Sequence, residues 1–378
     1  MAKLFEKTWI KGLELKNRSV RSATWSGVGD DHGFVVDTAL ELYGNLAAGG
    51  VGLIVTGFQY VTSNGVALPY QLGAYSDDHT EGLTRLAESI HAQGGKVAAQ
   101  LVHTGSKANP DLFHAGEEIQ APSSINDPVT GRTPKAMSAR DIATAVEAYA
   151  AAALRCKTAG FDGVQLHGAH GYGINQFLSS ASNARGDGYG GNVGKRYRFL
   201  GETMEAVKGS VGEGYPVMIK LSGHDYYEGG LTTEESLNIA RRLCDDGIDC
   251  IEISAGSRAS YDGMIPSRLK IQKREHEAYL AELAEMFKQS LTVPVITVGG
   301  IRSPSVIADI LSLGKADYTA MCRPFIREPH LIRRWESGDL TKAACVSCNG
   351  CFETALEGNG VCCKIDKKNR EKEGRTEA

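Results

Sequence analysis

The feature that most constrains the fold is an alternation of short, apolar, β-branched runs with longer helical patterns. The candidate strands are RSVRSAT, GLIVTGF, KVAAQLVH, GVQLHG, PVMIKLS, CIEISAG, PVITVGG and YTAMCR. Helical patterns accompany them at about 36–49, 77–94, 138–160, 194–211, 232–247, 274–290, 303–313 and 326–337. Strands that alternate with helices predict βαβ units and a parallel sheet. Eight such units predict an α/β fold of the (β/α)8 TIM-barrel type.

A doubly wound open sheet is the alternative, but no G-x-G-x-x-G follows the first strand to signal a dinucleotide-binding domain of that kind. A barrel also requires functional polar residues to gather at the C-terminal ends of the strands. Most of the candidate strands meet this requirement. The residues at these ends are Thr24, Trp25, Gly57, Gln100, His103, His167, His170, Lys220, Gly299, Gly300 and Arg323.

The domain organisation follows from the same pattern. We expect a barrel domain over residues 1–340 and a cysteine-rich extension with a charged tail over 341–378. The segment at about 104–137 is rich in Pro, Gly and Ser and joins the third and fourth strands, where a long loop commonly covers an active site. The mixed charges from residue 364 onward predict a solvated, partly disordered end.

Composition narrows the class of protein. The formal net charge of the 378 residues is −4, and Lys and Arg are spread evenly, which argues against a nucleic-acid or anionic-membrane surface. No apolar run approaches the length of a membrane span, and the N-terminus lacks the apolar core of a signal peptide. We therefore expect a cytoplasmic protein with a small-molecule substrate, and we leave open whether it forms a homo-oligomer.

The seventh and eighth candidate strands indicate a phosphate site. Gly299 and Gly300 end one strand and precede a helix, so that backbone amides and the helix N-terminus can approach an anion. Arg323 follows the next strand. In barrels this pair of loops is a frequent phosphate site.

His167 and His170 lie three residues apart at the end of the fourth strand. They could be metal ligands, but no carboxylate is clearly placed as a third ligand, and two satisfied core histidines at one strand end would be unusual. Alternatively, each neutral imidazole donates one N–H, so that the pair can bind one oxygen that gains negative charge. Tyr172 is close in sequence and offers a proton.

The run HGAHGYGINQFLSSASNARGDGYGGN resembles the signature of the old yellow enzyme family of FMN-dependent ene-reductases. LKNRSVRSATW, QLVHTG, VGGI and CRPF are similar to other segments of that family, so that the resemblance covers about residues 3–335. It implies that His167 and His170 bind the substrate oxygen, that hydride passes from the flavin to the β-carbon, and that Tyr172 protonates the α-carbon.

The resemblance also implies an FMN site, with NAD(P)H as the electron source. Ser22, Ala23, Thr24 and Trp25 would run along the flavin, Gly57 and Gln100 would meet the isoalloxazine, and Lys220 would lie near its anionic edge. Gly299, Gly300 and Arg323 would hold the phosphate, with Cys322 beside them. Two positions depart from the family pattern: Trp25 replaces a common Thr or Cys, and Lys220 replaces a common Arg, which loses the bidentate fork.

Five of the nine cysteines fall near the C-terminus: Cys345, Cys348, Cys351, Cys362 and Cys363. A disulfide framework is not expected in a long chain without a signal sequence. The C-x2-C-x2-C spacing predicts an iron–sulfur site, with zinc or free thiols as alternatives. The larger relatives of the dienoyl-CoA reductase and trimethylamine dehydrogenase branch carry a [4Fe–4S] cluster after the barrel, but the spacing here differs by one residue, which leaves Cys362 or Cys363 as the fourth ligand.

The function expected from this resemblance is an ene-reductase acting on an α,β-unsaturated carbonyl, acid or thioester. An amine dehydrogenase is an alternative, although amine substrates call for an aromatic cage rather than an oxygen-binding pair. A flavin and iron–sulfur electron-transfer subunit of a larger complex is the non-enzymatic alternative. The larger relatives continue into further domains, so that electrons here would come from NAD(P)H directly or from an electron-donor protein.

Overall fold

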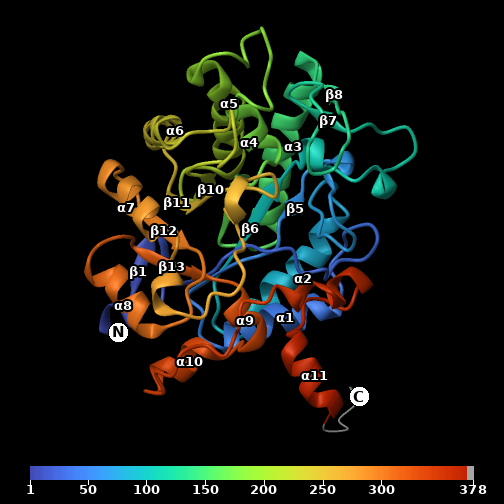
Figure 1. Cartoon of the computed structure of the whole chain (residues 1–378). Helices are drawn as coiled ribbons and strands as arrows, with labels where there is room; N and C mark the ends of the chain where they lie inside the picture. The colour runs from blue at the N-terminus through green and yellow to red at the C-terminus, as the bar shows by residue number, and fades with distance from the viewer. Residues whose placement is uncertain (373–378) are drawn as a thin grey trace.

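The computed structural model describes residues 1–372 and confirms a closed (β/α)8 TIM barrel (Figure 1). All eight candidate strands form. They are β3 (Ser19–Arg21), β4 (Leu53–Val55), β6 (Val97–Val102), β9 (Gly163–Gly168), β10 (Val217–Ser222), β11 (Cys250–Ser254), β12 (Val295–Val298) and β13 (Tyr318–Met321). Every barrel pairing is parallel, and the ring closes because β13 pairs with β3 while β4 pairs with β6.

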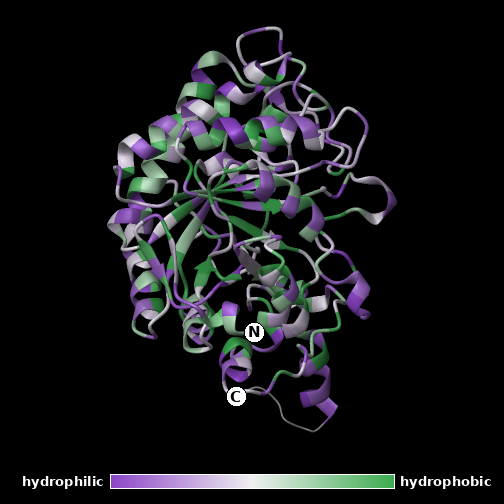
Figure 2. Ribbon diagram, turned by 90° about the vertical axis from the view of Figure 1, so that its left-hand side faces the viewer, coloured by the Kyte–Doolittle hydropathy of each residue, from purple (hydrophilic) through white to green (hydrophobic). Residues whose placement is uncertain are grey.

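The strands are hydrophobic because both of their faces are covered. β6, β9 and β10 are buried along their whole length, as expected for a parallel sheet enclosed by helices. Figure 2 shows the apolar strands in the middle of the molecule and hydrophilic residues toward its outside. A hairpin of β1 (Thr8–Ile10) and β2 (Leu13–Leu15) packs its apolar side chains against the interior of the barrel. The opposite end, where the strands finish, is left free for a site.

An outer ring of helices surrounds the barrel. Its members are α1 (Asp37–Ala48), α2 (His79–His91), α3 (Ala139–Thr158), α5 (Val193–Val211), α6 (Thr233–Asp245), α7 (Ala281–Ser290), α8 (Pro304–Ser312) and α10 (Leu331–Glu336). The short helices α4 (Gly173–Leu178) and α9 (Arg323–Arg327) follow the ends of β9 and β13. Ser138 and Asp141 form a reciprocal capping box that fixes where α3 begins.

Two expected helices are shorter or divided. The segment expected at 274–290 forms a 3-10 turn at Arg274–His276 and becomes α-helical only at Ala281, because the Glu277 carboxylate between them accepts the backbone N–H groups of Arg302 and Ser303. The segment expected at 326–337 splits into α9 and α10, with Pro329 between them. Proline lacks the N–H that a continuous helix would need.

The charged tail differs from its expectation. Residues Lys364–Lys372 form a helix, α11, instead of a disordered end, and Asp366 pairs with Arg327 of α9 at 2.8 Å. Residues 373–378 of that predicted segment lie outside the described part of the chain. The loop at 104–137 contains two short strands, β7 (Gln120–Ala121) and β8 (Lys135–Ala136), and β5 (Gln59–Tyr60) pairs with the end of β6. No helix in residues 1–372 is both long and apolar enough to cross a membrane.

Candidate active site

A cavity of about 490 Å³ lies at the C-terminal ends of the barrel strands. Its wall comes from the loops after β3, β4, β6, β9, β11, β12 and β13, together with β10 and the cysteine-rich segment. Twelve of the residues that the sequence singled out line this one cavity. They are Ser22, Ala23, Thr24, Trp25, His167, His170, Tyr172, Lys220, Gly299, Gly300, Cys322 and Arg323.

Gly57 and Gln100, which were expected to meet the flavin, do not line the cavity. Gly57 lies behind the first strand's loop: a Cβ added there would come within 2.8 Å of the carbonyl oxygen of Thr24. The Gln100 amide is buried and donates to the side-chain oxygen of Gln165 at 2.7 Å. Gln100 therefore belongs, in this structure, to a polar layer inside the barrel rather than to the cavity wall.

The floor of the cavity holds a buried ion pair that the sequence analysis missed. The Lys220 ammonium lies 3.1 Å from a carboxylate oxygen of Glu252, and both side chains are almost fully buried. Lys220 also donates to the Ser22 hydroxyl at 2.7 Å, and this hydroxyl donates to Glu252 at 2.6 Å. Gln165 donates to the second carboxylate oxygen of Glu252. A buried charge requires such partners, so that the charge of Lys220 is balanced rather than free.

The strand order could have revealed this pair. Lys220 and Glu252 occupy the same register on the neighbouring strands β10 and β11. A charged residue in the middle of the apolar run CIEIS was the signal. In a barrel, neighbours in sequence order are neighbours in space, which makes Lys220 the nearest available cation.

The histidine pair stands at the end of β9. The rings of His167 and His170 are 5.3 Å apart and nearly perpendicular. His170 adopts a left-handed backbone conformation, with φ of 63°, and its Nε2 shares a 2.7 Å hydrogen bond with the hydroxyl of Ser254 on β11. Nδ1 of His167 is buried and has no hydrogen-bond partner among the described residues. An orphaned buried nitrogen is costly and indicates a place for a ligand or water.

Both imidazoles are neutral near pH 7. Burial, followed by the nearby charges of Lys220 and Lys107, lowers the pKa of His170 to about 3. Burial and the proximity of His170 lower the pKa of His167 well below its usual value. A neutral imidazole carries a single N–H, so each ring can donate one hydrogen bond to an oxygen in the cavity.

Tyr172 completes this end of the site. Its ring packs against those of Phe58 and His167, with centroids 5.4 and 4.9 Å away. Burial raises the pKa of Tyr172 to about 12, so that the phenol keeps its proton at physiological pH. A protonated phenol beside the histidine pair is a group that can give a proton to a bound molecule.

The glycine loop after β12 forms the other end of the cavity. Gly299 and Gly300 have φ of 125° and 70°, and a Cβ on either would lie within 3 Å of the Tyr279 ring. Arg323 donates to the side-chain oxygen of Asn349 at 2.6 Å. Just before α8, the N–H groups of Arg302 and Ser303 are already used, because both bind the Glu277 carboxylate.

The segment that follows α10 folds back over the cavity. The Phe352 ring stacks on Trp25 with centroids 6.2 Å apart, and Ser347, Phe352 and Leu356 line the wall. Ala355 packs directly on Gly27. In Figure 1 this segment, drawn in red, passes close to α1 and α9. It therefore helps to shape the site, although no sequence signal connected its side chains to the cavity.

The five cysteines of this segment do not form a metal site in the structure. Cys345 and Cys351 are buried, Cys348 is exposed, and Cys362 and Cys363 are partly buried. Within residues 1–372, no group of three or more His, Cys, Asp or Glu side chains is arranged to hold a metal ion. The iron–sulfur cluster predicted from the spacing is thus not supported, because loop cysteines at regular spacing need not converge.

Several residues of the wall were not foreseen from the sequence. Most lie in loops, where spacing carries little information, although Ser254 ends a strand and the barrel rule could have found it. These additional residues include Phe58, Lys107, Ser254, Arg258, Tyr279, Arg302 and Phe352.

Comparisons with known proteins agree with this geometry. The model of the NADH:flavin oxidoreductase / NADH oxidase family matches residues 3–341. The NADPH dehydrogenase of Clostridium acetobutylicum is 36% identical over 331 residues, which are 87% of this chain and 93% of that protein. The NADH oxidase of Thermoanaerobacter brockii is 34% identical over 353 residues, which are 92% of this chain but 53% of that protein. The chain therefore spans about half the length of this longer relative.

A solved structure shares the fold over most of this chain. The complex of 2-naphthoyl-CoA reductase with 2-naphthoyl-CoA has a TM-score of 0.86 and 28% identity to this chain. The match covers 94% of this chain and 56% of that one.

Proposed function

Because the chain belongs to the NADH:flavin oxidoreductase / NADH oxidase family, we propose that this oxidoreductase is an FMN-dependent ene-reductase. It would reduce the C=C bond of an α,β-unsaturated carbonyl, acid or thioester, with NAD(P)H as the electron source. The observation that carries the proposal is the histidine pair with an orphaned buried nitrogen, beside a protonated tyrosine in the family's cavity.

The charge of the cavity wall suits FMN. The wall contains five Lys or Arg side chains and no Asp or Glu, which suits a phosphate and an electron-rich ring. Ser22 to Trp25 and Lys220 would lie along the isoalloxazine, and Gly299, Gly300 and Arg323 would bind the phosphate. When bound, FMN would supply the hydride that reduces the substrate.

The protein's own groups would position the substrate and move a proton. The neutral imidazoles of His167 and His170 would donate hydrogen bonds to the substrate oxygen, which gains charge in the transition state. Their depressed pKa values keep this donor set the same across the neutral range. The Tyr172 phenol would give its proton to the α-carbon, and Phe58 would keep water from that side of the pocket.

A sharp test measures flavin content and both half-reactions. FMN should be released from the purified protein, and NAD(P)H should drive the reduction of cyclohexenone. Replacing either histidine, as His167→Ala or His170→Ala, should slow reoxidation by cyclohexenone by a factor that corresponds to roughly 2.7–4 kcal/mol, the cost of losing one oxyanion donor. Glu205→Gln, which changes an exposed residue of α5, is a control that should change neither half-reaction. FAD in place of FMN, or equal reoxidation rates in the histidine variants and the native protein, would refute the proposal.

The proposal does not include an iron–sulfur cluster. The described residues offer no assembled ligand set, so that electrons are assigned to NAD(P)H alone. An electron-transfer subunit would require such a cluster.

A further inference from the structure

The wall of the cavity is strongly cationic. The five cationic side chains are Lys107, Lys220, Arg258, Arg302 and Arg323, and no acidic side chain joins them. Two like charges in a partly buried pocket repel each other unless an anion lies between them. A cation without an internal partner is therefore a candidate to bind an anionic ligand.

Four of the five have internal partners, and three of these four lie in the floor or toward the glycine loop. Lys220 pairs with Glu252 in the floor. Arg302 donates to the backbone carbonyl of Ala343, and Arg323 donates to the carbonyl of Arg268 and to Asn349 beside the glycine loop. These three serve the flavin ring and the phosphate end under the proposed function.

Lys107 and Arg258 lie at the opposite end, beside the histidine pair. The Lys107 side chain covers Gly171: a Cβ placed on this glycine would lie 3.3 Å from Nζ. The charge of Lys107 contributes to the lowered pKa of His170, and the charge of Arg258 acts on Tyr172. Both cations are thus close to the groups that would hold the substrate.

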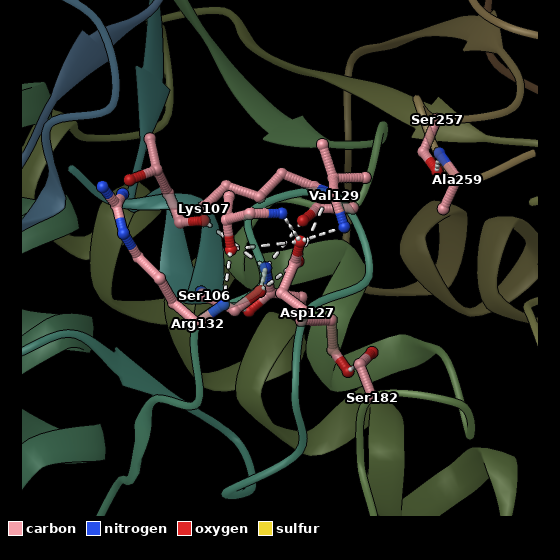
Figure 3. A network of polar contacts seen from close by, with 12 residues as sticks. Ser106, Lys107, Asp127, Val129, Arg132, Ser182, Ser257 and Ala259 are labelled. Carbon is pink, nitrogen blue, oxygen red and sulfur yellow. Dashed lines mark hydrogen bonds and ion pairs between the residues drawn. The ribbon is translucent and has the colours of Figure 1, made fainter.

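Lys107 has one internal partner, and that contact is long. Its ammonium is 3.4 Å from a carboxylate oxygen of Asp127 (Figure 3). This carboxylate already accepts the Ser106 hydroxyl at 2.7 Å and the N–H groups of Val129 and Thr130 at 2.9 and 3.0 Å. Asp127 is therefore satisfied by its own loop, and the remaining N–H groups of Lys107 stay available to the cavity.

Arg258 has no internal partner. Among residues 1–372 its exposed side chain makes neither a hydrogen bond nor an ion pair, although it lines the cavity. It comes from the loop after β11, whereas Lys107 comes from the loop after β6. The two cations thus reach the substrate end from different loops, and no acidic side chain lines the cavity beside them.

We propose that Lys107 and Arg258 bind a carboxylate carried by the unsaturated substrate, so that the preferred substrates are anionic rather than neutral. This inference rests on the proposed ene-reductase function and names its substrate class. The overall reaction balances as unsaturated carboxylate, NAD(P)H and one proton giving saturated carboxylate and NAD(P)⁺. The carboxylate itself stays unchanged and serves only for recognition.

The test uses two substrates that differ by one charge. Cyclohexenone carrying a carboxylate on its β-carbon is compared with the methyl ester of the same compound, in FMN-loaded protein with NADPH. The ratio of kcat/KM for the acid to that for the ester is measured, because changes in general reactivity cancel between variants. Removing each cation, as Lys107→Met and Arg258→Met, should lower this ratio about tenfold, and the double variant about 100-fold.

A matched control removes the same two charges elsewhere. Arg140→Met with Lys195→Met changes exposed residues at the starts of α3 and α5, and the acid-to-ester ratio should stay as in the native protein. Arg258→Met alone guards against a folding defect, because among residues 1–372 that exposed side chain has no hydrogen bond or ion pair to lose. A ratio that is the same in the native protein and in Arg258→Met overturns the inference.

Two further measurements distinguish binding of the substrate carboxylate from binding of the electron donor. If the double variant slows flavin reduction by NADPH as much as it slows reduction of the acid, the cations bind the phosphates of the donor and the inference is overturned. Thermal stabilisation by benzoate, relative to benzamide, should be lost in the double variant, and this readout needs no turnover. If neither acid nor ester is reduced, the ene-reductase function itself fails.

Discussion

The histidine pair and the cysteine-rich segment look alike in sequence but differ in the folded chain. Both place ligand-type residues three positions apart: His167 and His170 in one case, Cys345 and Cys348 in the other. The histidines end a barrel strand, and β10 and β11 bring Lys220 and Ser254 to them. The cysteines occupy a segment without regular structure, and the described residues assemble no ligand set there. Regularly spaced ligand-type residues form a site only where neighbouring strands or loops bring further side chains into contact with them.

The largest expected effect is a loss of stability in the region of the histidine pair, which the barrel strands build. Glu252→Ala leaves Lys220 buried without its partner and should cost about 3–5 kcal/mol in the free energy of unfolding, measured by urea titration. The double variant Lys220→Met with Glu252→Met removes both charges and should recover most of the loss. If Glu252→Ala is as stable as the native protein, the ion pair does not hold this region together.

The next prediction distinguishes a catalytic role from a structural role for Tyr172 in the same region. Tyr172→Phe should slow the reoxidation of the reduced protein by cyclohexenone about 100-fold, because a general acid contributes at least that factor. Reduction by NAD(P)H should change little, since that half-reaction needs no proton from the phenol. Stopped-flow measurements of the two half-reactions give the comparison, and equal slowing of both would assign Tyr172 a structural role.

A smaller effect concerns pH. The folded-state pKa of His170 is about 3, below the unfolded value of 6.5, so that the unfolded chain binds a proton first as the pH falls. Stability should therefore decrease between about pH 6.5 and pH 3, by at most about 1.4 kcal/mol per pH unit for this histidine. His170→Ala should flatten that slope in urea titrations at about pH 6.5 and pH 5. A steeper slope in the variant would contradict the assignment.

The smallest effect is expected in the cysteine-rich segment. Cys348 is exposed, so Cys348→Ser should change the free energy of unfolding by no more than about 0.5 kcal/mol. Cys156→Ser, which alters a buried thiol on α3, is the contrasting control and should cost more. A large loss in Cys348→Ser, together with iron or zinc that this variant lacks and Cys156→Ser keeps, would show that metal binding assembles the ligands. The cysteine-rich segment would then form a site as the histidine pair does, and the difference drawn between the two regions would be wrong.

Much of the fold could be predicted because it depends on local signals. The eight strands were visible as β-branched runs, and the residues at their ends followed from the barrel geometry. The division between α9 and α10 was also within reach, since Pro329 lies inside the expected helix at 326–337. The late start of α7 was not, because it depends on Glu277 binding backbone groups of a loop far along the chain.

The sequence by itself determined the barrel and the end of it that carries polar residues, because strand period and strand order act locally along the chain. It also carried the resemblance that led to the family. Only the tertiary structure decided which residues are in contact. Gly57 and Gln100 do not line the cavity, and Lys220 pairs with Glu252. Lys107 and Arg258 line the same cavity as the histidines. Such contacts join loops and strands distant in sequence, and their geometry is set by packing that no local pattern encodes.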